Sequence, residues 1–333
     1  MSKLQLLNIM LLKKLTLPEL LSNSCSKFKN NLSLNFVQSG KRTYQDFYNE
    51  VTSIANYLLS SGIRKGDKIA ILSANMPNWG ITQFAIARIG AIAVPVLPGF
   101  SSIEIQNILE HSESKIIFVS KLLYKLVADI KTSYLEQKIL MNTFARIPED
   151  YPVEAIDKLE NNIGLNNLTP LPAIQVEEED TASIIYTSGT TGFSKGVELT
   201  HRNLVWNARQ CATIQPVSTQ DRFLSILPLA HTYENTLGLL LPVMFGAQIY
   251  YLDRVPTPKL LVPAMQKIRP TVMLSVPLII EKIYKTQVLP KFTSSALMKT
   301  LYNFGPTRKL FNRLAGKKLM QTFGGKIVFF GIG

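Results

Sequence analysis

The sequence predicts a layered α/β fold with mostly parallel sheets flanked by helices. Short apolar runs bounded by turn residues, as in buried strands, alternate along the chain with longer segments in which apolar residues recur with helical periodicity. Alternation of this kind is typical of β-α units whose strands run parallel. The chain has 333 residues, of which 46% are hydrophobic, so it can bury one large core or two smaller ones.

The first β-α unit has clear boundaries. Thr43 precedes Asp46 with the spacing of a capping box, and the apolar residues that follow recur on one face, which predicts a helix from about Tyr44 to Ser61. The run Lys68–Leu72 is bounded by turn residues as a buried strand should be. Pro77 is suited to the first turn of the next helix.

The same alternation continues downstream. Ile92–Val96 and Ile116–Val119 have strand-like sequences, and Ser101 with Glu104 has the spacing that caps a helix between them. The uncharged run Asn235–Leu252 has nearly the length of a membrane span, but it contains proline, glycine and polar residues. We therefore expect a buried helix followed by a strand there.

Polar and irregular regions suggest the domain organisation. Residues 1–35 are expected to form an N-terminal extension, with a short amphipathic helix at Met1–Leu17 and no secretory cleavage site. Further along, a stretch of the chain is polar and contains proline, and this stretch ends in an acidic run. We expect an exposed connection there, with a soft subdomain boundary near residues 161–180 inside a domain that spans residues 36–333.

Composition indicates the cellular compartment of the protein and the kinds of binding partner. The only two cysteines, Cys25 and Cys211, have no zinc-site or disulfide spacing, which indicates a reducing compartment and a cytoplasmic protein. The net charge of +13 favours anionic partners, including nucleotides and an acidic lipid surface on which the protein would be peripheral. Lysine and arginine are scattered without aromatic interleaving, so no nucleic-acid partner is expected.

The sharpest chemical signal is the segment Thr187–Gly196, which follows the apolar run Ala182–Tyr186. Its serine, threonine and glycine residues provide closely spaced hydroxyls and unobstructed backbone amides, and Lys195 adds a cation. Such a loop is suited to hold phosphate oxygens. A simple turn between strands is the alternative, because turns often have this composition.

Residue order excludes two better-known phosphate-binding motifs. The Walker A loop ends in Gly-Lys-Ser/Thr, whereas Lys195 is preceded by Ser194 and followed by Gly196. The dinucleotide fingerprint requires a glycine spacing that Gly189 and Gly192 do not give.

In these residues the chain resembles the adenylate-forming (AMP-binding) enzymes, which include acyl-CoA synthetases, luciferases and peptide-synthetase adenylation domains. The segment corresponds to the family's phosphate loop, with Ser194 where proline is more usual. The resemblance implies that the β- and γ-phosphates of ATP are held by Thr187, Ser188, Gly189, Thr190, Thr191 and Gly192. It also implies that Thr187 approaches Mg²⁺ and that Lys195 steadies the departing pyrophosphate.

A second segment, Leu227–Asn235, is similar to the family's segment that brings a histidine or aromatic residue to the carboxylate and adenylate site. His231 is the candidate catalytic residue, together with Lys195. Pro228 breaks a strand predicted over Asp221–Leu227, so His231 is placed at a strand-to-helix junction, where binding residues often occur. A capping or packing role is the alternative for His231. His111 and His201 are expected only to end and to begin helices.

The wording Leu-Pro-Leu-Ala-His-Thr-Tyr-Glu and a basic insertion at Tyr284–Lys318 are similar to the long-chain fatty acyl branch of the family. Amino-acid and aryl-acid activating enzymes are the alternatives. The resemblance covers the chain from about Phe36 to its end, where a strand over Lys326–Phe330 would expose an edge. The family's C-terminal lid domain is expected to be absent, so that either a companion chain supplies it, the reading frame has been cut short, or the chain has become a binding module.

The implied activity is therefore that of an acid–thiol ligase. A fatty acid would react with ATP to give an acyl-adenylate, and coenzyme A or an acyl carrier protein would then displace AMP. The chain alone is expected to be inactive, because the contacts that strengthen in the transition state would come mostly from the absent part. The alternative is a non-catalytic protein that binds a nucleotide, an acyl chain or a membrane.

Overall fold

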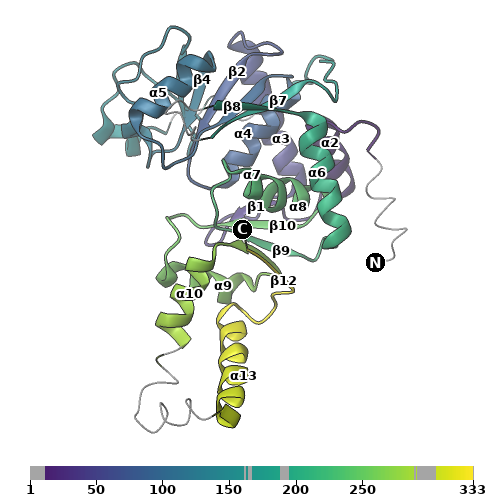
Figure 1. Cartoon of the computed structure of the whole chain (residues 1–333). Coiled ribbons are helices and arrows are strands. Elements are labelled where there is room, and N and C mark those ends of the chain that lie inside the picture. Colours follow the sequence, from purple (N-terminus) through teal and green to yellow (C-terminus); the bar gives the residue numbers. More distant parts are fainter. Residues whose placement is uncertain are drawn as a thin grey trace.

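The computed structural model describes residues 12–160, 163, 167–187, 195–288, 290 and 305–332. It contains two sheets with helices between them and on their outer faces (Figure 1). The predicted layered α/β class with mostly parallel sheets is therefore confirmed.

The larger sheet has seven strands in the order β6-β5-β4-β2-β3-β7-β8. The strands are β2 (Lys68–Leu72), β3 (Ile92–Pro95), β4 (Ser114–Val119), β5 (Gln137–Leu140), β6 (Ala145–Ile147), β7 (Thr181–Thr187) and β8 (Lys195–Thr200). Only the two edge strands, β6 and β8, run antiparallel to their neighbours. The inner strands therefore all end at the same edge of the sheet.

The smaller sheet has five strands in the order β1-β10-β9-β11-β12, and all of its pairings are parallel. The strands are β1 (Leu34–Phe36), β9 (Arg222–Ser225), β10 (Gln248–Tyr251), β11 (Val272–Ser275) and β12 (Phe329–Ile332). β12 lies at the edge, as predicted, but starts at Phe329. The chain turns at Gly324, whose φ is +88° and where a Cβ would lie 2.4 Å from the Met265 carbonyl oxygen, so pairing begins only after the turn.

A layer of helices separates the two sheets and shares one core with both. Ile71 of β2, Trp79 of α4 and Ile249 of β10 are all buried in this core. The central helices are α2 (Leu17–Lys27), α3 (Tyr44–Ser60), α4 (Pro77–Arg88), α6 (His201–Ile214), α7 (Thr232–Glu234), η3 (Asn235–Leu240) and α8 (Leu241–Met244). The run predicted as a buried helix and strand, Asn235–Leu252, forms η3, α8 and β10.

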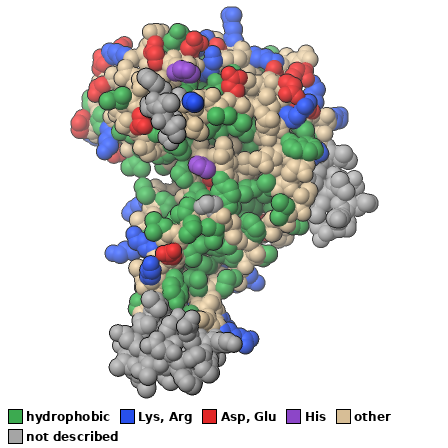
Figure 2. All heavy atoms as spheres, in the orientation of Figure 1, with side chains coloured by type: hydrophobic (Ala, Val, Ile, Leu, Met, Phe, Trp, Pro, Cys, Tyr) green, Lys and Arg blue, Asp and Glu red, His purple; other side chains and the backbone are tan. Residues whose placement is uncertain are grey.

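The outer faces of the sheets have separate, smaller cores. The seven-stranded sheet is covered by α5 (Ser102–His111), η1 (Tyr124–Leu126) and η2 (Val153–Lys158). The five-stranded sheet is accompanied by α9 (Pro258–Ile268), α10 (Pro277–Ile283), η4 (Tyr284–Val288) and α13 (Gly305–Thr322). Figure 2 shows charged side chains of both signs interspersed around the larger sheet and hydrophobic side chains gathered over the smaller one.

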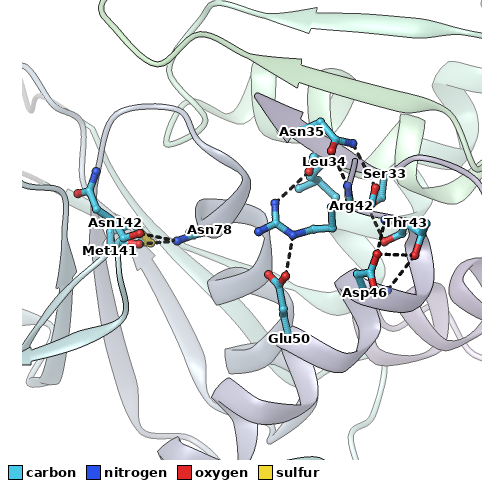
Figure 3. A network of polar contacts seen from close by, with 10 residues as sticks. All are labelled: Ser33, Leu34, Asn35, Arg42, Thr43, Asp46, Glu50, Asn78, Met141 and Asn142. Atoms are coloured by element: carbon cyan, nitrogen blue, oxygen red, sulfur yellow. Dashed lines mark hydrogen bonds and ion pairs between the residues drawn. The ribbon is translucent and has the colours of Figure 1, made fainter. Parts of the chain in front are cut away.

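The two capping boxes predicted from the sequence are confirmed. Thr43 with Asp46 and Ser101 with Glu104 both form reciprocal capping boxes at the starts of α3 and α5. Arg42, just before the first of these boxes, binds Glu50 of α3 and the Leu34 carbonyl of β1 (Figure 3). This network fastens β1 of the smaller sheet to a central helix.

The N-terminal region is part of the fold. The helix expected at Met1–Leu17 lies mostly outside the described residues, and α2 instead begins at Leu17, whose side chain is fully buried. Leu17 donates its amide to His201 Nδ1 at 3.3 Å, and Lys14 pairs with Glu177. Residues 17–35, which fall within the expected extension of residues 1–35, therefore supply a central helix and most of the strand β1.

The soft boundary near residues 161–180 stays a prediction. Part of this segment lies outside the described residues, and β7 and β8, which follow it, still belong to the larger sheet. The chain passes to the smaller sheet through α6, after Thr200.

Candidate functional site

The candidate phosphate loop joins two antiparallel strands at the edge of the larger sheet. β7 ends at Thr187 and β8 begins at Lys195, and these two residues lie directly opposite each other. Directly opposed residues have Cβ atoms about 4.5–5.5 Å apart, so the long Lys195 side chain can reach an anion held beside Thr187. The five candidate residues between them, Ser188, Gly189, Thr190, Thr191 and Gly192, lie outside the described residues.

The direction of β7 places this loop at a ligand-binding edge. β7 runs parallel to β3, with Ser183 opposite Ala93, so Thr187 lies at the edge where β2, β3 and β4 also end. Ligands of open α/β sheets bind outside the carboxyl ends of the strands. The position of Thr187 thus fits a binding role better than a simple turn.

The other two histidines, His111 and His201, have structural partners. His111 Nδ1 lies 2.7 Å from the Tyr186 hydroxyl, so the end of α5 is fastened to β7 one residue before Thr187. His201 is the first residue of α6, as expected from the sequence. Burial lowers the pKa of His201 to about 4, so its ring is neutral at pH 7.

His231 lies at the junction predicted from the sequence. It follows β9 and Pro228, and it forms the N-cap of α7 by accepting from the Tyr233 amide at 3.3 Å through Nδ1. Because Nδ1 accepts this bond, the proton of the neutral ring is on Nε2. The side chain is exposed, so Nε2 is accessible to a ligand.

An asparagine from the other sheet holds the His231 segment. Asn75, just after β2, donates to Ser225 Oγ at 2.9 Å and also to the Leu227 carbonyl. Its Oδ1 accepts from the Leu229 amide at 2.9 Å. Nothing in the sequence indicated this role, because the two segments are about 150 residues apart.

Glu234 is a second residue that the sequence analysis did not single out. It is buried, and Ser225 Oγ donates to its Oε1 at 2.6 Å. Burial raises the pKa of Glu234 to about 8. The sequence feature that could have identified Glu234 is its position, because this acid immediately precedes the long uncharged run that starts at Asn235.

A cavity of about 800 Å³ lies between the two sheets, at the carboxyl ends of β2 and β4 on one side and of β1, β9 and β10 on the other. Its walls are mostly apolar, and its charged side chains are of both signs: Arg254, Asp253, and Lys121 paired with Asp157 at 3.0 Å. Its size is that of a typical small-molecule site. It shares Pro228 with the His231 segment, whereas Thr187, Lys195 and His231 are not among its lining residues.

One wall of this cavity is fixed by hydrogen bonds to backbone groups. Asn78, at the start of α4, donates to the Met141 and Asn142 carbonyls at 2.7 and 3.2 Å (Figure 3). The Asn142 side chain then accepts from the Lys121 amide at 2.8 Å. The ends of β4 and β5 are thereby fastened to a helix of the central layer.

No group of three or more histidine, cysteine, aspartate or glutamate side chains suited to a metal ion is found in the described part of the chain. Within the same described ranges, no helix is long and apolar enough to cross a membrane.

A comparison of the whole chain with known protein families agrees with the resemblance seen in the sequence. Residues 21–326 match the model of the AMP-binding enzyme family. The chain belongs to this family, and the resemblance stated from the sequence is confirmed.

The relatives identified by sequence are acyl-CoA ligases. The acyl-CoA ligase SID4 of Ajellomyces capsulatus is 27% identical over 323 residues, which cover 93% of this chain and 54% of the relative. The long-chain-fatty-acid–CoA ligase FadD15 of Mycobacterium tuberculosis is 30% identical over 249 residues, which cover 72% of this chain and 39% of the relative. The chain thus spans about half the length of such relatives.

The similar solved structures support the fold. The putative long-chain-fatty-acid CoA ligase of Rhodopseudomonas palustris has a TM-score of 0.70 and 21% sequence identity to this chain. The match covers 81% of this chain and 65% of that structure.

Proposed function

We propose that this chain provides the phosphate-binding part of an ATP-dependent ligase that converts a long-chain fatty acid, through an acyl-adenylate, to acyl-CoA. The observation that carries the proposal is the pairing of Thr187 with Lys195 at the two ends of the candidate loop, on the carboxyl edge of the larger sheet. Membership of the AMP-binding family and the similarity to acyl-CoA ligases support it.

The chemistry begins with attack of a carboxylate oxygen on the α-phosphorus of ATP. The bond from this phosphorus to the pyrophosphate oxygen breaks, and Lys195 stabilises the charge that develops on the departing pyrophosphate. Mg²⁺, when bound beside Thr187, would supply further positive charge at the β- and γ-phosphates. His231 would approach the carboxylate and the adenylate, with its Nε2 proton as donor.

In the second step a thiolate attacks the carbonyl carbon of the acyl-adenylate, and AMP leaves. Coenzyme A is the proposed thiol, and an acyl carrier protein is the alternative. The cavity between the sheets suits a substrate with an apolar stretch, because its walls are mostly apolar. Aryl acids and amino acids, as substrates of other family members, remain the alternatives to a fatty acid.

The decisive test is ATP–pyrophosphate exchange with fatty acids of increasing length, measured with the purified chain alone and with a polypeptide that covers the rest of a relative. We expect exchange that requires the added polypeptide and is lost in Lys195→Ala. The matched control is Lys259→Ala, which removes an exposed lysine elsewhere. Exchange that is absent from every mixture, together with no binding of ATP, would reject the ligase function.

A further inference from the structure

A buried carboxyl group lies in the segment that carries His231. Glu234 is only 1% exposed, and one of its oxygens, Oε2, has no hydrogen-bond partner among the described residues. The other oxygen accepts from Ser225 Oγ at 2.6 Å. Burying an acidic group costs free energy unless neighbouring groups form hydrogen bonds with it. The burial of Glu234 therefore needs a structural or functional reason.

The hydrogen bond to Ser225 continues into the other sheet. Ser225 Oγ accepts from Asn75 Nδ2, and Asn75 in turn holds the Leu227 carbonyl and the Leu229 amide. The series Glu234–Ser225–Asn75 therefore runs from α7 through the end of β9 to the end of β2. Two of its members, Ser225 and Asn75, line the cavity between the sheets.

The backbone around Glu234 is shaped to receive its carboxyl group. A Cβ at Gly238 would lie 2.5 Å from Glu234 Oε1, so any side chain at this position would displace the carboxyl group. Gly238 belongs to η3, whose π-helical hydrogen bonding is rare and occurs often at functional sites. The glycine and the acid thus form one arrangement.

We propose that Glu234 is a positioning residue that holds, through Ser225 and Asn75, the Leu227–Asn235 segment and the adjoining cavity wall in place. Its consequence for catalysis rests on the proposed ligase function, since His231 lies in the same segment. Its structural part is independent of that function and can be measured without substrates.

The protonation state of Glu234 suits this role. With its pKa raised to about 8 by burial, the carboxyl group is neutral at pH 7 and can donate as well as accept a hydrogen bond. The titratable groups around it are Tyr233 and, on β10, Tyr251; burial raises the pKa of both, and the Glu234 charge adds to this effect. Cys211 of α6 adds to the effect at Tyr233, whereas Arg42 opposes it at Tyr251. Glu234 ionises more readily when the segment opens, so the segment should loosen as the pH rises from about 4.5 to about 8.

Hydrogen–deuterium exchange of the full chain, followed in peptides that cover residues 226–237, tests this role. At pH 7 we expect Glu234→Ala to raise exchange about tenfold, as for a lost buried hydrogen bond. Glu234→Gln keeps a donor and an acceptor and should stay within about twofold of wild type. Glu281→Gln, at an exposed glutamate, is the matched control and should change nothing.

Two further measurements keep the test decisive. Ser225→Ala removes the hydrogen-bond partner of Glu234 and should raise exchange as much as Glu234→Ala. It replaces Glu234→Ala in the test if that variant does not fold. Between pH 5 and pH 8, after correction for intrinsic rates, wild type should gain exchange, because Glu234 ionises near its ordinary pKa of 4.5 when the segment opens but only near 8 when it is closed, and Glu234→Gln should not. Unchanged exchange in Ser225→Ala, or equal pH dependence in wild type and Glu234→Gln, would overturn the proposal. A failed pyrophosphate-exchange assay would reject only the ligase function.

Discussion

Lys195 lies directly opposite Thr187 in the antiparallel pairing of β8 with β7. The seven residues between them thus leave and re-enter the sheet at one point on its edge. Because β7 is parallel to the inner strands, this point is at the carboxyl edge, and the hydroxyl and the ammonium group can act on the same anion.

The first prediction concerns Lys195. Replacing it by alanine should weaken ATP binding about 10- to 100-fold, because a hydrogen bond to a charged group contributes roughly 1.5–3 kcal/mol. Calorimetric titration of ATP measures this effect, and Lys195→Arg should retain part of the affinity. An unchanged affinity in Lys195→Ala, when Lys259→Ala also binds normally, would show that Lys195 does not contact the phosphates.

Thr187 is predicted to assist the magnesium complex of ATP. Thr187→Val keeps the shape and the β-propensity of the side chain but removes the hydroxyl, so it should reduce the gain in affinity that Mg²⁺ gives over EDTA. Thr213→Val removes an exposed hydroxyl on α6 and is the control. The same gain from Mg²⁺ in Thr187→Val and wild type would contradict a role at the metal.

His201 should give a specific pH dependence of stability. Its folded-state pKa, about 4, lies below the ordinary value of 6.5, so the unfolded chain binds the proton more readily between these pH values. Its contribution to stability is therefore fully present above pH 6.5 and is lost as the pH falls towards 4. The stability difference between wild type and His201→Asn in urea unfolding should shrink over this window. A stability difference between wild type and His201→Asn that is constant with pH would refute the role of His201. Leu20→Ala, which removes no titratable group, is the control and should give a constant difference.

Leu20→Ala also tests whether the N-terminal region belongs to the fold. Leu20 is fully buried in the core shared by the two sheets, so its truncation should cost about 2–5 kcal/mol of unfolding free energy. Ile103, which is 73% exposed, should tolerate alanine within about 0.5 kcal/mol. If α2 were a dispensable extension, the two variants would be equally stable.

Weak attachment to anionic membranes is the last prediction. The net charge of +13 should give binding to phosphatidylserine-containing vesicles at low salt and release at high salt, since screening shortens the range of these interactions. Exposed lysines near the five-stranded sheet, at Lys282, Lys317 and Lys318, are candidates, and replacing all three by glutamine should reduce co-sedimentation. Equal binding to uncharged phosphatidylcholine vesicles would argue against an electrostatic surface.

Helices, caps and inner strands were predictable because their signals are local. The capping boxes at Thr43 and Ser101 depend on residues three positions apart, and Ile92–Val96 and Ile116–Val119 are apolar runs between turns. The strand-to-helix junction at His231 follows from Pro228 in the same way. Each can be read without knowing what lies next to it in space.

Partners far apart in sequence were not predictable. β1 pairs with β10, more than two hundred residues away, so the sequence alone predicts an extension over most of β1 rather than a strand. The hold of Asn75 on the Leu227 and Leu229 backbone, and the burial of Glu234 beside Ser225, depend on how the two sheets meet. Neither residue has a local pattern that distinguishes these roles from an ordinary turn or helix cap.

The amino-acid sequence by itself determined the α/β class and the family, and it predicted the phosphate loop, because these depend on periodicity and on the order of neighbouring residues. Only the tertiary structure decided that Lys195 faces Thr187, that Asn75 and Glu234 brace the His231 segment, and that a cavity lies between the sheets. The physical reason is that strand register, burial and cavity shape arise from packing between distant segments, which no local pattern encodes.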